Sequence, residues 1–444
     1  MNQIFKLLDQ ESFLQKNTIN LIASENYPSS KVLELQGSIF NNKYGEGYPF
    51  KRYYAGNANT DVLESEVKEL ALEVFNAAEN YDVNIQCLSG SPANSMVYLA
   101  MLEYNDTIMS MNLSNGGHLS HLHTTSNWNK FFKHVTYDIN KDLSINIQDY
   151  TDKIITHRPK LVIIGFSSYP LSFEFKDMIR IAHDNGALVL CDIAHISGLI
   201  ASGNHPSPFI GDSIEQADFV TTTTHKTFRG PRGALIFSKK NLVDYYQSSA
   251  PFSKLIDKTV FPGTSGGPHF STIAGIGQAC LEILGKDQYD DKITYKDYIK
   301  QVKLNITALE KGLMFDNLNE AKTDTNKETL NLNKNLILIT PSSNHLTLIK
   351  LPDELDSLII QKKLESYGII TNRNLIPFDN KTAWKPSGLR LGSPAMTSRG
   401  ANEKDMFTIG IYINQIINNT LDEDAFTEFK SELFLRLNNP AYLK

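Results

Sequence analysis

The sequence predicts an α/β protein in which a large domain built on a mostly parallel sheet is followed by a smaller α+β domain. Short apolar runs alternate with segments of helical periodicity through the first two-thirds of the chain. This alternation is typical of strand–helix–strand units whose strands run parallel. None of the apolar runs approaches the roughly 20 residues that a membrane-spanning helix needs. We therefore expect no membrane segment.

The periodicity assigns the elements of the large domain in chain order. Apolar runs bounded by turn residues predict buried strands. These strands are expected at 83–88, 161–166, 187–191, 219–224 and 234–237. Helical spacing is expected at 95–104, at 175–185 and, with Gly285 as an interruption, from about 271 to 313.

The last third of the chain predicts a separate, smaller unit. Residues 318–337 are rich in Asn, Lys and Thr, which favours an exposed insertion. Strand-like segments at 345–351 and 368–374 and a helical segment at 403–418 follow it. The predicted organisation is an N-terminal arm over 1–20, a large domain over 21–280, and a linking helix with a small domain over 281–444.

Composition excludes several classes of function. The 444 residues carry 43 Lys+Arg against 49 Asp+Glu, a net charge of -6, whereas binding to a phosphate backbone needs a basic surface. Nucleic acid is therefore not expected as the main partner. The three cysteines, Cys87, Cys191 and Cys280, are too few and too far apart for a disulfide framework or a zinc cluster. We expect a cytoplasmic protein without a metal site or an export signal.

Lys226 lies in an unusual polar run, TTTTHKT, between two predicted strands. One interpretation is a surface lysine on a threonine-rich turn, and for a lysine taken alone this interpretation is favoured. The other is a Schiff-base lysine, whose amine must reach a buried aldehyde and be available without its proton.

Asp192 ends the predicted strand at 187–191. The carboxyl ends of parallel strands are where α/β folds bind ligands. Pyridoxal phosphate needs an acid in such a place, because a carboxylate keeps its pyridine nitrogen protonated. An ordinary helix N-cap is the alternative role, since Asp caps helices well. His195 follows closely and can approach the same place.

The segment 89–94 (SGSPAN) joins a predicted strand to a predicted helix. Ser91 fits the N-cap and Pro92 the first helical position. A helix N-terminus presents free N–H groups to a phosphate, although many ordinary helices begin this way. A second loop of small residues, 261–268, also allows close approach to a phosphate. A phosphate turn, a strand-end Asp and a Lys in a polar turn, in this order, indicate a pyridoxal-phosphate domain.

From about Ile19 to Tyr442 the chain resembles the serine hydroxymethyltransferase family, whose members are fold-type I pyridoxal-phosphate enzymes. The most specific stretches are 21–29 (LIASENYPS), 42–57 (NKYGEGYPFKRYYAGN), 112–121 (NLSNGGHLSH), 191–201 (CDIAHISGLIA), 221–234 (TTTTHKTFRGPRGA) and 387–400 (SGLRLGSPAMTSRG).

The resemblance implies roles at the cofactor. Lys226 would form the internal aldimine, Asp192 would pair with the pyridine nitrogen, and His118 would stack on the ring. The remaining cofactor residues implied are Gly90, Ser91 and His225 at the phosphate, Ser167 near a cofactor oxygen, His195, Tyr44, and Gly267 from the other subunit.

The resemblance also implies the substrate and folate sites. Arg390 would bind the amino-acid carboxylate, for which a guanidinium fork is suited. Glu46 would be the acid/base group, and it would enter from the partner subunit together with Tyr44 and Tyr54. Other implied substrate residues are Ser24 and His195, and the implied folate residues are Leu113, Gly117, Leu119 and Asn374.

The implied reaction converts serine and tetrahydrofolate reversibly to glycine and 5,10-methylenetetrahydrofolate, through an external aldimine and a glycine quinonoid. A homodimer or tetramer with shared active sites is implied as well. Two alternatives remain at this point. One is a folate-independent threonine aldolase or transaldolase with the same cofactor machinery. The other is a catalytically silent scaffold, which the presence of Lys226, Asp192, Arg390 and Glu46 together disfavours.

Overall fold

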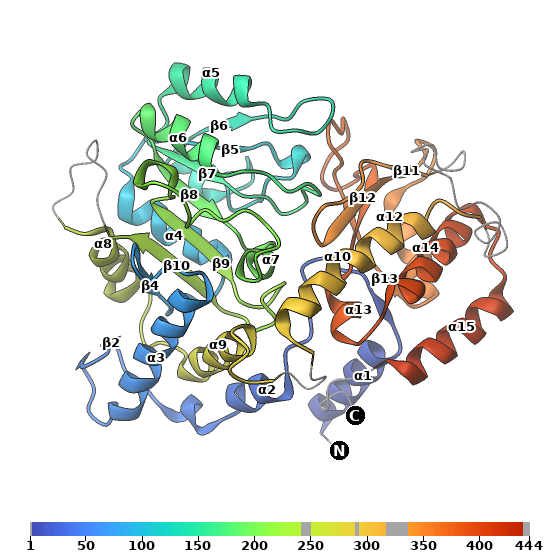
Figure 1. Ribbon diagram of the computed structural model, residues 1–444, viewed down its shortest axis with the longest axis horizontal. Coiled ribbons are helices and arrows are strands. Elements are labelled where there is room, and N and C mark those ends of the chain that lie inside the picture. Colours follow the sequence, from blue (N-terminus) through green and yellow to red (C-terminus); the bar gives the residue numbers. More distant parts are fainter. Residues whose placement is uncertain (1, 241–249, 289–292, 317–335, 438–444) are drawn as a thin grey trace. The chain divides into compact units, whose positions relative to one another are not determined.

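The computed structural model describes residues 2–240, 250–288, 293–316 and 336–437 (Figure 1). The chain forms two compact units. The large unit comprises Lys31–Ser167 and Ser172–Tyr289, and the small unit comprises Met1–Ser30, Ser168–Leu171 and Asp290–Lys444. Most of the predicted insertion at 318–337 lies outside the described residues; its last residue, Ile337, begins a strand. No helix in the described ranges is long and apolar enough to cross a membrane.

The large unit is built on a sheet that has, within the described residues, seven strands in the order β4-β10-β9-β8-β7-β5-β6. All neighbouring pairs from β9 to β6 are parallel, and β10 runs antiparallel to both β4 and β9. The prediction of an α/β fold with a mostly parallel sheet is thus confirmed. The strands are β4 (Tyr81–Asn84), β5 (Thr107–Met111), β6 (Lys133–Tyr137), β7 (Leu161–Ile164), β8 (Leu188–Asp192), β9 (Phe219–Thr223) and β10 (Ala234–Lys239).

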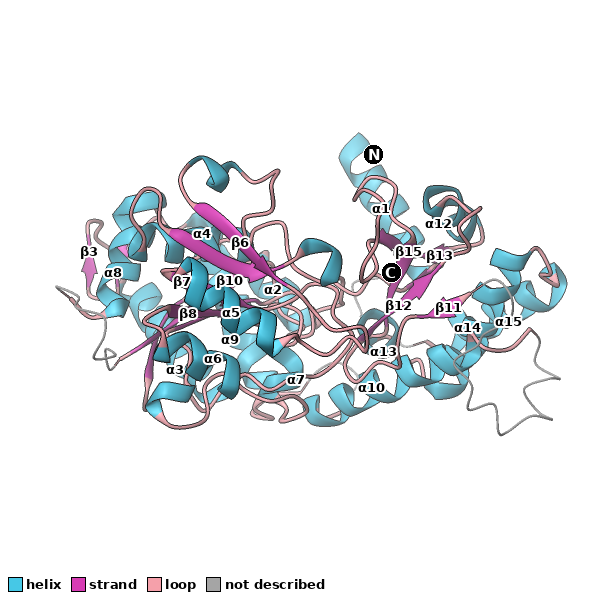
Figure 2. Ribbon diagram, turned by 90° about the horizontal axis from the view of Figure 1, so that it is seen from above, coloured by secondary structure: helices cyan, strands magenta, loops and turns pink. Residues whose placement is uncertain are grey.

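Helices flank this sheet on both sides in Figure 2. They are α2 (Ser30–Gln36), α3 (Ala58–Val74), α4 (Gly90–Met101), α5 (Ile147–His157), α6 (Lys176–Asp184), α7 (Ser197–Ala201), α8 (Phe252–Lys258) and α9 (Phe270–Ile283). The central strands β7, β8 and β9 are buried along nearly their whole length, as strands covered on both faces should be. A short hairpin of β2 (Gly47–Tyr48) and β3 (Lys51–Arg52) precedes α3.

Three predicted element boundaries are wrong, each for a local reason. The strand predicted at 83–88 ends at Asn84, because the Asn84 side chain accepts the N–H of Gln86 at 3.0 Å and turns the chain. The helix predicted from 271 to 313 is two helices, α9 and α10 (Tyr295–Gly312). Gly285, in the left-handed region at φ 69°, follows the end of α9.

The helix predicted to begin at Pro92 begins two residues earlier. Gly90 is the first helical residue of α4 and Ser89 is its N-cap, with an extended backbone. The carbonyl of Ser89 accepts the N–H of Ala93 at 3.1 Å, which closes the first helical turn. Ser91 and Pro92 therefore lie inside the first turn.

The small unit combines short sheets with long helices. Its antiparallel sheet has the order β11-β12-β15-β14, and β1 pairs in parallel with β13. The strands are β1 (Ile19–Asn20), β11 (Ile337–Leu338), β12 (Leu346–Lys350), β13 (Ile369–Ile370), β14 (Asn372–Asn374) and β15 (Gly388–Gly392). The helices are α1 (Gln3–Lys16), α10, α12 (Ser357–Ser366), α13 (Pro394–Ser398), α14 (Glu403–Asn418) and α15 (Glu423–Arg436).

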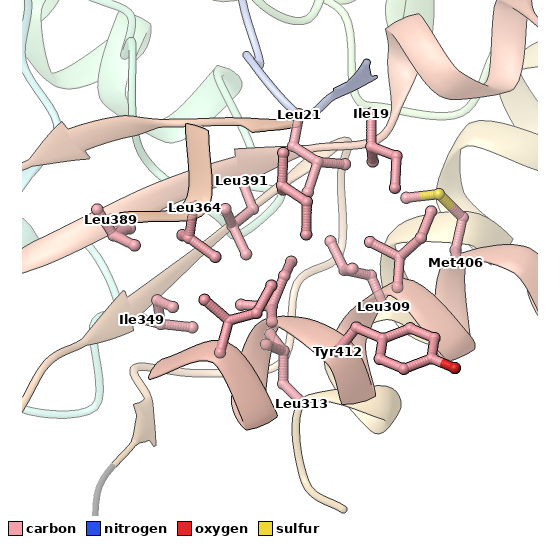
Figure 3. Close-up of a cluster of buried hydrophobic side chains, with 14 of the residues drawn as sticks. Ile19, Leu21, Leu309, Leu313, Ile349, Leu364, Leu389, Leu391, Met406 and Tyr412 are labelled. Carbon is pink, nitrogen blue, oxygen red and sulfur yellow. The ribbon is translucent and has the colours of Figure 1, made fainter. Parts of the chain in front are cut away.

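An apolar core holds the small unit together (Figure 3). Leu309 of α10 and Leu313, which directly follows this helix, meet Met406 and Tyr412 of α14 in this core. The two helices approach closely at Gly312, where a Cβ atom would overlap the carbonyl of Phe407.

The N-terminal segment belongs to this core, and the division of the chain therefore differs from the boundaries expected at 20/21 and 280/281. Ile19 and Leu21 are fully buried in it, and β1 adds to β13. The buried guanidinium of Arg399 donates to the carbonyls of Lys16 at 2.6 Å and of Thr18 at 2.9 Å. These contacts link residues far apart in sequence, so local patterns do not reveal them.

Candidate active site

A cavity of about 350 Å³ in the large unit collects the cofactor residues that the sequence predicted. Loops that follow β4, β7, β8 and β9 line it, together with the start of α4 and the turn after β5. It therefore lies at the carboxyl ends of the central strands, the usual ligand position of this kind of sheet. The predicted residues that line it are Gly90, Ser91, His118, Ser167, Asp192, His195, His225 and Lys226.

Asp192 ends β8 with its side chain at the cavity wall, only 11% exposed. One carboxylate oxygen, Oδ2, accepts hydrogen bonds from Asn94 Nδ2 at 2.8 Å and from His121 Nε2 at 2.9 Å. Burial alone would raise the pKa of Asp192, but the hydrogen bond and charge of His121 and the hydrogen bond from Asn94 outweigh it. The net result is a pKa well below the ordinary value, so Asp192 is a carboxylate at every physiological pH.

Lys226 follows β9 in a loop whose threonines are buried. Thr224 Oγ1 donates to the carbonyl of Pro231 at 2.6 Å, and Thr227 Oγ1 donates to the carbonyl of His195 at 2.9 Å. The threonine run is thus an internal scaffold for the lysine. The interpretation of Lys226 as a surface lysine on a solvated turn is wrong.

The start of α4 lines the cavity through Gly90 and Ser91, and the first turn of a helix offers backbone N–H groups as hydrogen-bond donors. Ser89 makes no side-chain cap bond to the first turn of α4. Gly90 packs so close to Thr223 that a Cβ atom would lie 2.8 Å from its methyl carbon. Within the described residues, Nδ1 of His225 is buried without a hydrogen-bond partner. Burial, with smaller contributions from the charges of Lys226 and Arg232, lowers the pKa of His225 to about 3.

His118 lies on the turn after β5. Gly116 adopts φ 111°, and its carbonyl accepts the N–H of Ser167 at 2.8 Å. Ser167 Oγ also donates to the carbonyl of Gly117 at 2.7 Å, which joins this turn to the loop after β7. Three predicted folate residues share the segment: Leu113, Gly117 and Leu119, of which Leu119 is 53% exposed.

A second group of predicted residues, Tyr44, Glu46, Tyr54 and Gly267, also lies together in the large unit. The Tyr44 hydroxyl donates to Glu46 Oε1 at 3.1 Å, and the rings of Tyr44 and Tyr54 meet edge to face at 5.0 Å. The hydrogen bond and the negative charge of Glu46 raise the pKa of Tyr44. A Cβ atom at Gly267 would lie 3.0 Å from the Tyr44 ring, so glycine allows this close approach.

The last three predicted residues lie in the small unit. Arg390 is a buried residue of β15, and its Nε donates to Asn372 Oδ1 at 3.2 Å. Burial lowers the pKa of Arg390 to about 10, so the guanidinium remains charged. Asn374 lies on β14, and its Nδ2 donates to the carbonyl of Leu375 at 2.6 Å. Ser24 is half-buried in a turn after β1.

Comparison with known proteins identifies the family. The family model for serine hydroxymethyltransferase matches residues 1–413. A serine hydroxymethyltransferase of Desulfotalea psychrophila is 41% identical over 97% of this chain and 92% of its own length. One of Sorangium cellulosum is 39% identical over the same shares of both chains. The chain belongs to the serine hydroxymethyltransferase family.

Members of this family are fold-type I enzymes that use pyridoxal phosphate as cofactor and tetrahydrofolate as co-substrate. The cavity fits that cofactor. It offers an ionised acid for the ring nitrogen in Asp192, an amine in Lys226, and, at His225 Nδ1, a buried polar atom that lacks a partner among the described residues. An anionic phosphate also suits the positive end of α4 and the guanidinium of Arg232.

Sequence reasoning missed several residues of the serine hydroxymethyltransferase cavity. Ser120, His121, Thr223 and Arg232 line it, and Asn94 contacts Asp192 from behind. All five lie within the segments that carried the family resemblance or the phosphate turn. Their position in those segments was the available signal, but only the folded sheet shows which side chains meet.

Proposed function

We propose that this protein is a pyridoxal-phosphate-dependent serine hydroxymethyltransferase, which transfers the hydroxymethyl carbon of serine to tetrahydrofolate and releases glycine. The observation that carries the proposal is the meeting of Lys226, Asp192 and His118 around one cavity in a chain of this family. The names of the two relatives favour this reaction over that of a folate-independent aldolase.

The cofactor residues have separate tasks in this proposal. Pyridoxal phosphate, when bound, supplies an electron sink for the electron pair left on the α-carbon. Asp192 holds the proton on the ring nitrogen, and its low pKa suits that task because the carboxylate never has to lose its own proton first. Lys226 Nζ holds the cofactor covalently, His118 covers the ring, and the start of α4 with His225 binds the phosphate.

The substrate residues bind and move protons. Arg390 binds the carboxylate of the amino acid, and Glu46 exchanges a proton with the reacting oxygen. Tyr44 donates to Glu46 Oε1, which keeps one lone-pair direction of the carboxylate occupied and orients the other oxygen. The folate contacts proposed are Leu113, Gly117, Leu119 and Asn374.

The assembly and the compartment are part of the proposal. Tyr44, Glu46, Tyr54 and Gly267 serve the active site of a partner subunit, so the working form is at least a homodimer. We place the protein in the cytoplasm, because Cys87, Cys191 and Cys280 are free and buried, as thiols of a reducing compartment are.

One assay tests the reaction. Purified holoenzyme is given serine labelled at the hydroxymethyl carbon, with and without tetrahydrofolate, and the products are separated. We expect glycine and labelled methylenetetrahydrofolate only when tetrahydrofolate is present. Serine turnover that ignores tetrahydrofolate, with a new β-hydroxy amino acid formed from threonine and an added aldehyde, would overturn the proposal in favour of a transaldolase.

A further inference from the structure

The carboxylate of Asp192 and the imidazole of His118 are joined by a chain of hydrogen bonds that runs through one buried amide. Asn94 is 1% exposed. Its Nδ2 donates to Asp192 Oδ2 at 2.8 Å and to Ser120 Oγ at 3.1 Å. Its Oδ1 accepts the hydroxyl of Thr221 at 2.6 Å. Both N–H groups and the carbonyl of the amide are therefore in use.

The neighbours of Asn94 fix its orientation. An ionised carboxylate can only accept, so the atom of Asn94 that faces Asp192 must be the NH₂ group. Rotating the amide by half a turn would place its carbonyl oxygen against the carboxylate. Thr221 on β9 then supplies the hydroxyl that the Asn94 oxygen accepts. The amide is thus bonded to Thr221 of the sheet through its oxygen and to the carboxylate of Asp192 through its NH₂ group.

The same amide is connected to His118 through Ser120. Ser120 Oγ accepts from Asn94 and can turn its own hydrogen to Nδ1 of His118, which is 2.7 Å away. The backbone N–H of Ser120 also donates to this Nδ1, at 3.1 Å. Nδ1 of His118 is therefore an acceptor, and a neutral His118 carries its proton on Nε2. One turn further along α4, Tyr98 donates to the carbonyl of Ser120 at 2.9 Å and fixes its backbone.

We propose that Asn94 is a positioning residue that sets the acid at the ring nitrogen and the imidazole over the ring in one fixed relation. The inference rests on the proposed cofactor roles of Asp192 and His118. Because Asn94 lies on the helix whose first turn meets the phosphate, α4 aligns both ends of the cofactor. A rigid helix is suited to this, since sites held by regular elements keep their geometry better than sites held by loops.

The chain contains a matched control. Asn84 is 4% exposed in the same unit, and its Nδ2 also donates to a carboxylate, that of the half-buried Asp257 at 2.8 Å, and to a hydroxyl oxygen, that of Tyr48 at 3.0 Å. It is not among the residues that line the cavity. Asn94→Leu and Asn84→Leu remove the same kind of bonds, so they separate an effect on the cofactor from a general loss of stability.

The test measures the affinity for pyridoxal phosphate after the cofactor has been removed from the purified enzyme. Asn94→Leu should weaken binding roughly 10- to 100-fold, because a bond to a charged group is lost while its carboxylate stays buried. Asn84→Leu should change binding less than about twofold. In the loaded enzyme, Asn94→Leu should lower kcat more than it raises KM for serine, whose carboxylate is bound by Arg390.

A second variant keeps the proposal testable if Asn94→Leu fails to fold. Asn94→Asp introduces a carboxyl that can donate to Asp192 only when it is protonated. Its affinity for pyridoxal phosphate, relative to wild type, should therefore rise as the pH falls from 8 to 6. The proposal would be overturned if Asn94→Leu and Asn94→Asp both bound pyridoxal phosphate with wild-type affinity, or if Asn84→Leu lost as much affinity as Asn94→Leu. It would also be overturned if the affinity of Asn94→Asp relative to wild type did not change with pH. Cofactor binding is measured without turnover, so failure of the proposed transferase reaction would be seen separately.

Discussion

The cavity and segment 44–54 differ in how far their polar side chains are exposed. In the cavity the functional carboxylate of Asp192 is only 11% exposed and accepts hydrogen bonds from Asn94 and His121. In segment 44–54 the side chains of Tyr44, Tyr53 and Tyr54 are 46–80% exposed. All the residues that line the cavity belong to the large unit, whereas segment 44–54 presents tyrosine side chains to the outside.

The backbone of this exposed segment is supported by hydrogen bonds from the side chain of Arg52. Arg52 NH1 donates to the carbonyls on both sides of Glu46, at 3.1 Å to Gly45 and at 2.6 Å to Gly47. The same guanidinium pairs with Asp61 at 2.8 Å and with Glu64 at 2.5 Å, both on α3. Exposed side chains on a supported backbone can reach into the active site of a partner subunit. This arrangement is consistent with the shared active site that we propose.

The largest effect on activity is expected from a substitution in the cavity. Lys226→Ala should abolish the covalent hold on the cofactor and lower activity by roughly 10³-fold or more. Lys239 is the control, because it is another buried lysine of the large unit whose pKa burial lowers. Borohydride reduction and peptide mapping should place the cofactor on Lys226. A label on Lys239 would show that the site is misassigned.

Mixing inactive subunits tests whether segment 44–54 serves the partner. Lys226→Ala and Glu46→Gln should each be inactive alone. Random dimers of the two should recover about a quarter of the wild-type activity, since half of the dimers are mixed and each mixed dimer has one intact site. Lys226→Ala mixed with Asp192→Ala should recover none, because both residues belong to the same cavity. Recovery in that control, or none in the first mixture, contradicts the division of roles.

Breaking the support behind segment 44–54 should destabilise the protein. Arg52→Ala leaves Asp61 and Glu64 buried without their cation, which typically costs about 3–5 kcal/mol. Urea unfolding followed by circular dichroism measures this loss. The exposed pair of Lys286 and Glu73 is the control, and Lys286→Ala should cost less than about 1 kcal/mol. If the two variants lost the same free energy of unfolding, the contacts of Arg52 would stabilise the protein no more than an exposed ion pair does.

The cavity should make stability depend on pH, whereas segment 44–54 should not. Because the pKa of His225 is about 3 in the fold, the unfolded chain binds its proton first as the pH falls below 6.5. Stability is therefore lost in that direction, by about 2 kcal/mol between pH 6.5 and 5. His225→Asn should reduce the slope by about this amount in the cofactor-free protein, and Tyr44→Phe should leave it unchanged. The part of the slope that comes from His134, whose pKa burial lowers to about 4, should remain in both variants. A wild-type slope in His225→Asn would rule out His225 as its source.

The smallest effect is expected at the tip of the hairpin. Phe50 is 73% exposed and has φ 61°, a left-handed conformation that favours glycine. Phe50→Gly should change the free energy of unfolding of a subunit by less than about 1 kcal/mol. If this face meets a partner, the same change should weaken the dimer in sedimentation experiments. An unchanged dimer would place Phe50 outside the interface.

The fold class and the candidate residues of the site could be predicted from local features of the sequence. A strand-end Asp192, a Lys226 among threonines and a helix start at 89–94 are local features, each tied to one strand end. Local periodicity also located β7, β8, β9 and α14 to within a few residues. These features can be read from the sequence because short-range backbone preferences and the period of burial produce them.

Which side chains meet could not be predicted from the sequence, because it depends on how the strands and helices pack. Asn94, Thr221 and Asp192 are separated by long stretches of chain, and they touch because β8 and β9 are neighbours in the sheet and α4 packs on β9. Ile19 and Leu21 belong to the core of the small unit for the same kind of reason, since β1 pairs with β13. Strand order and helix packing depend on contacts that are distant in sequence, and no local pattern records them.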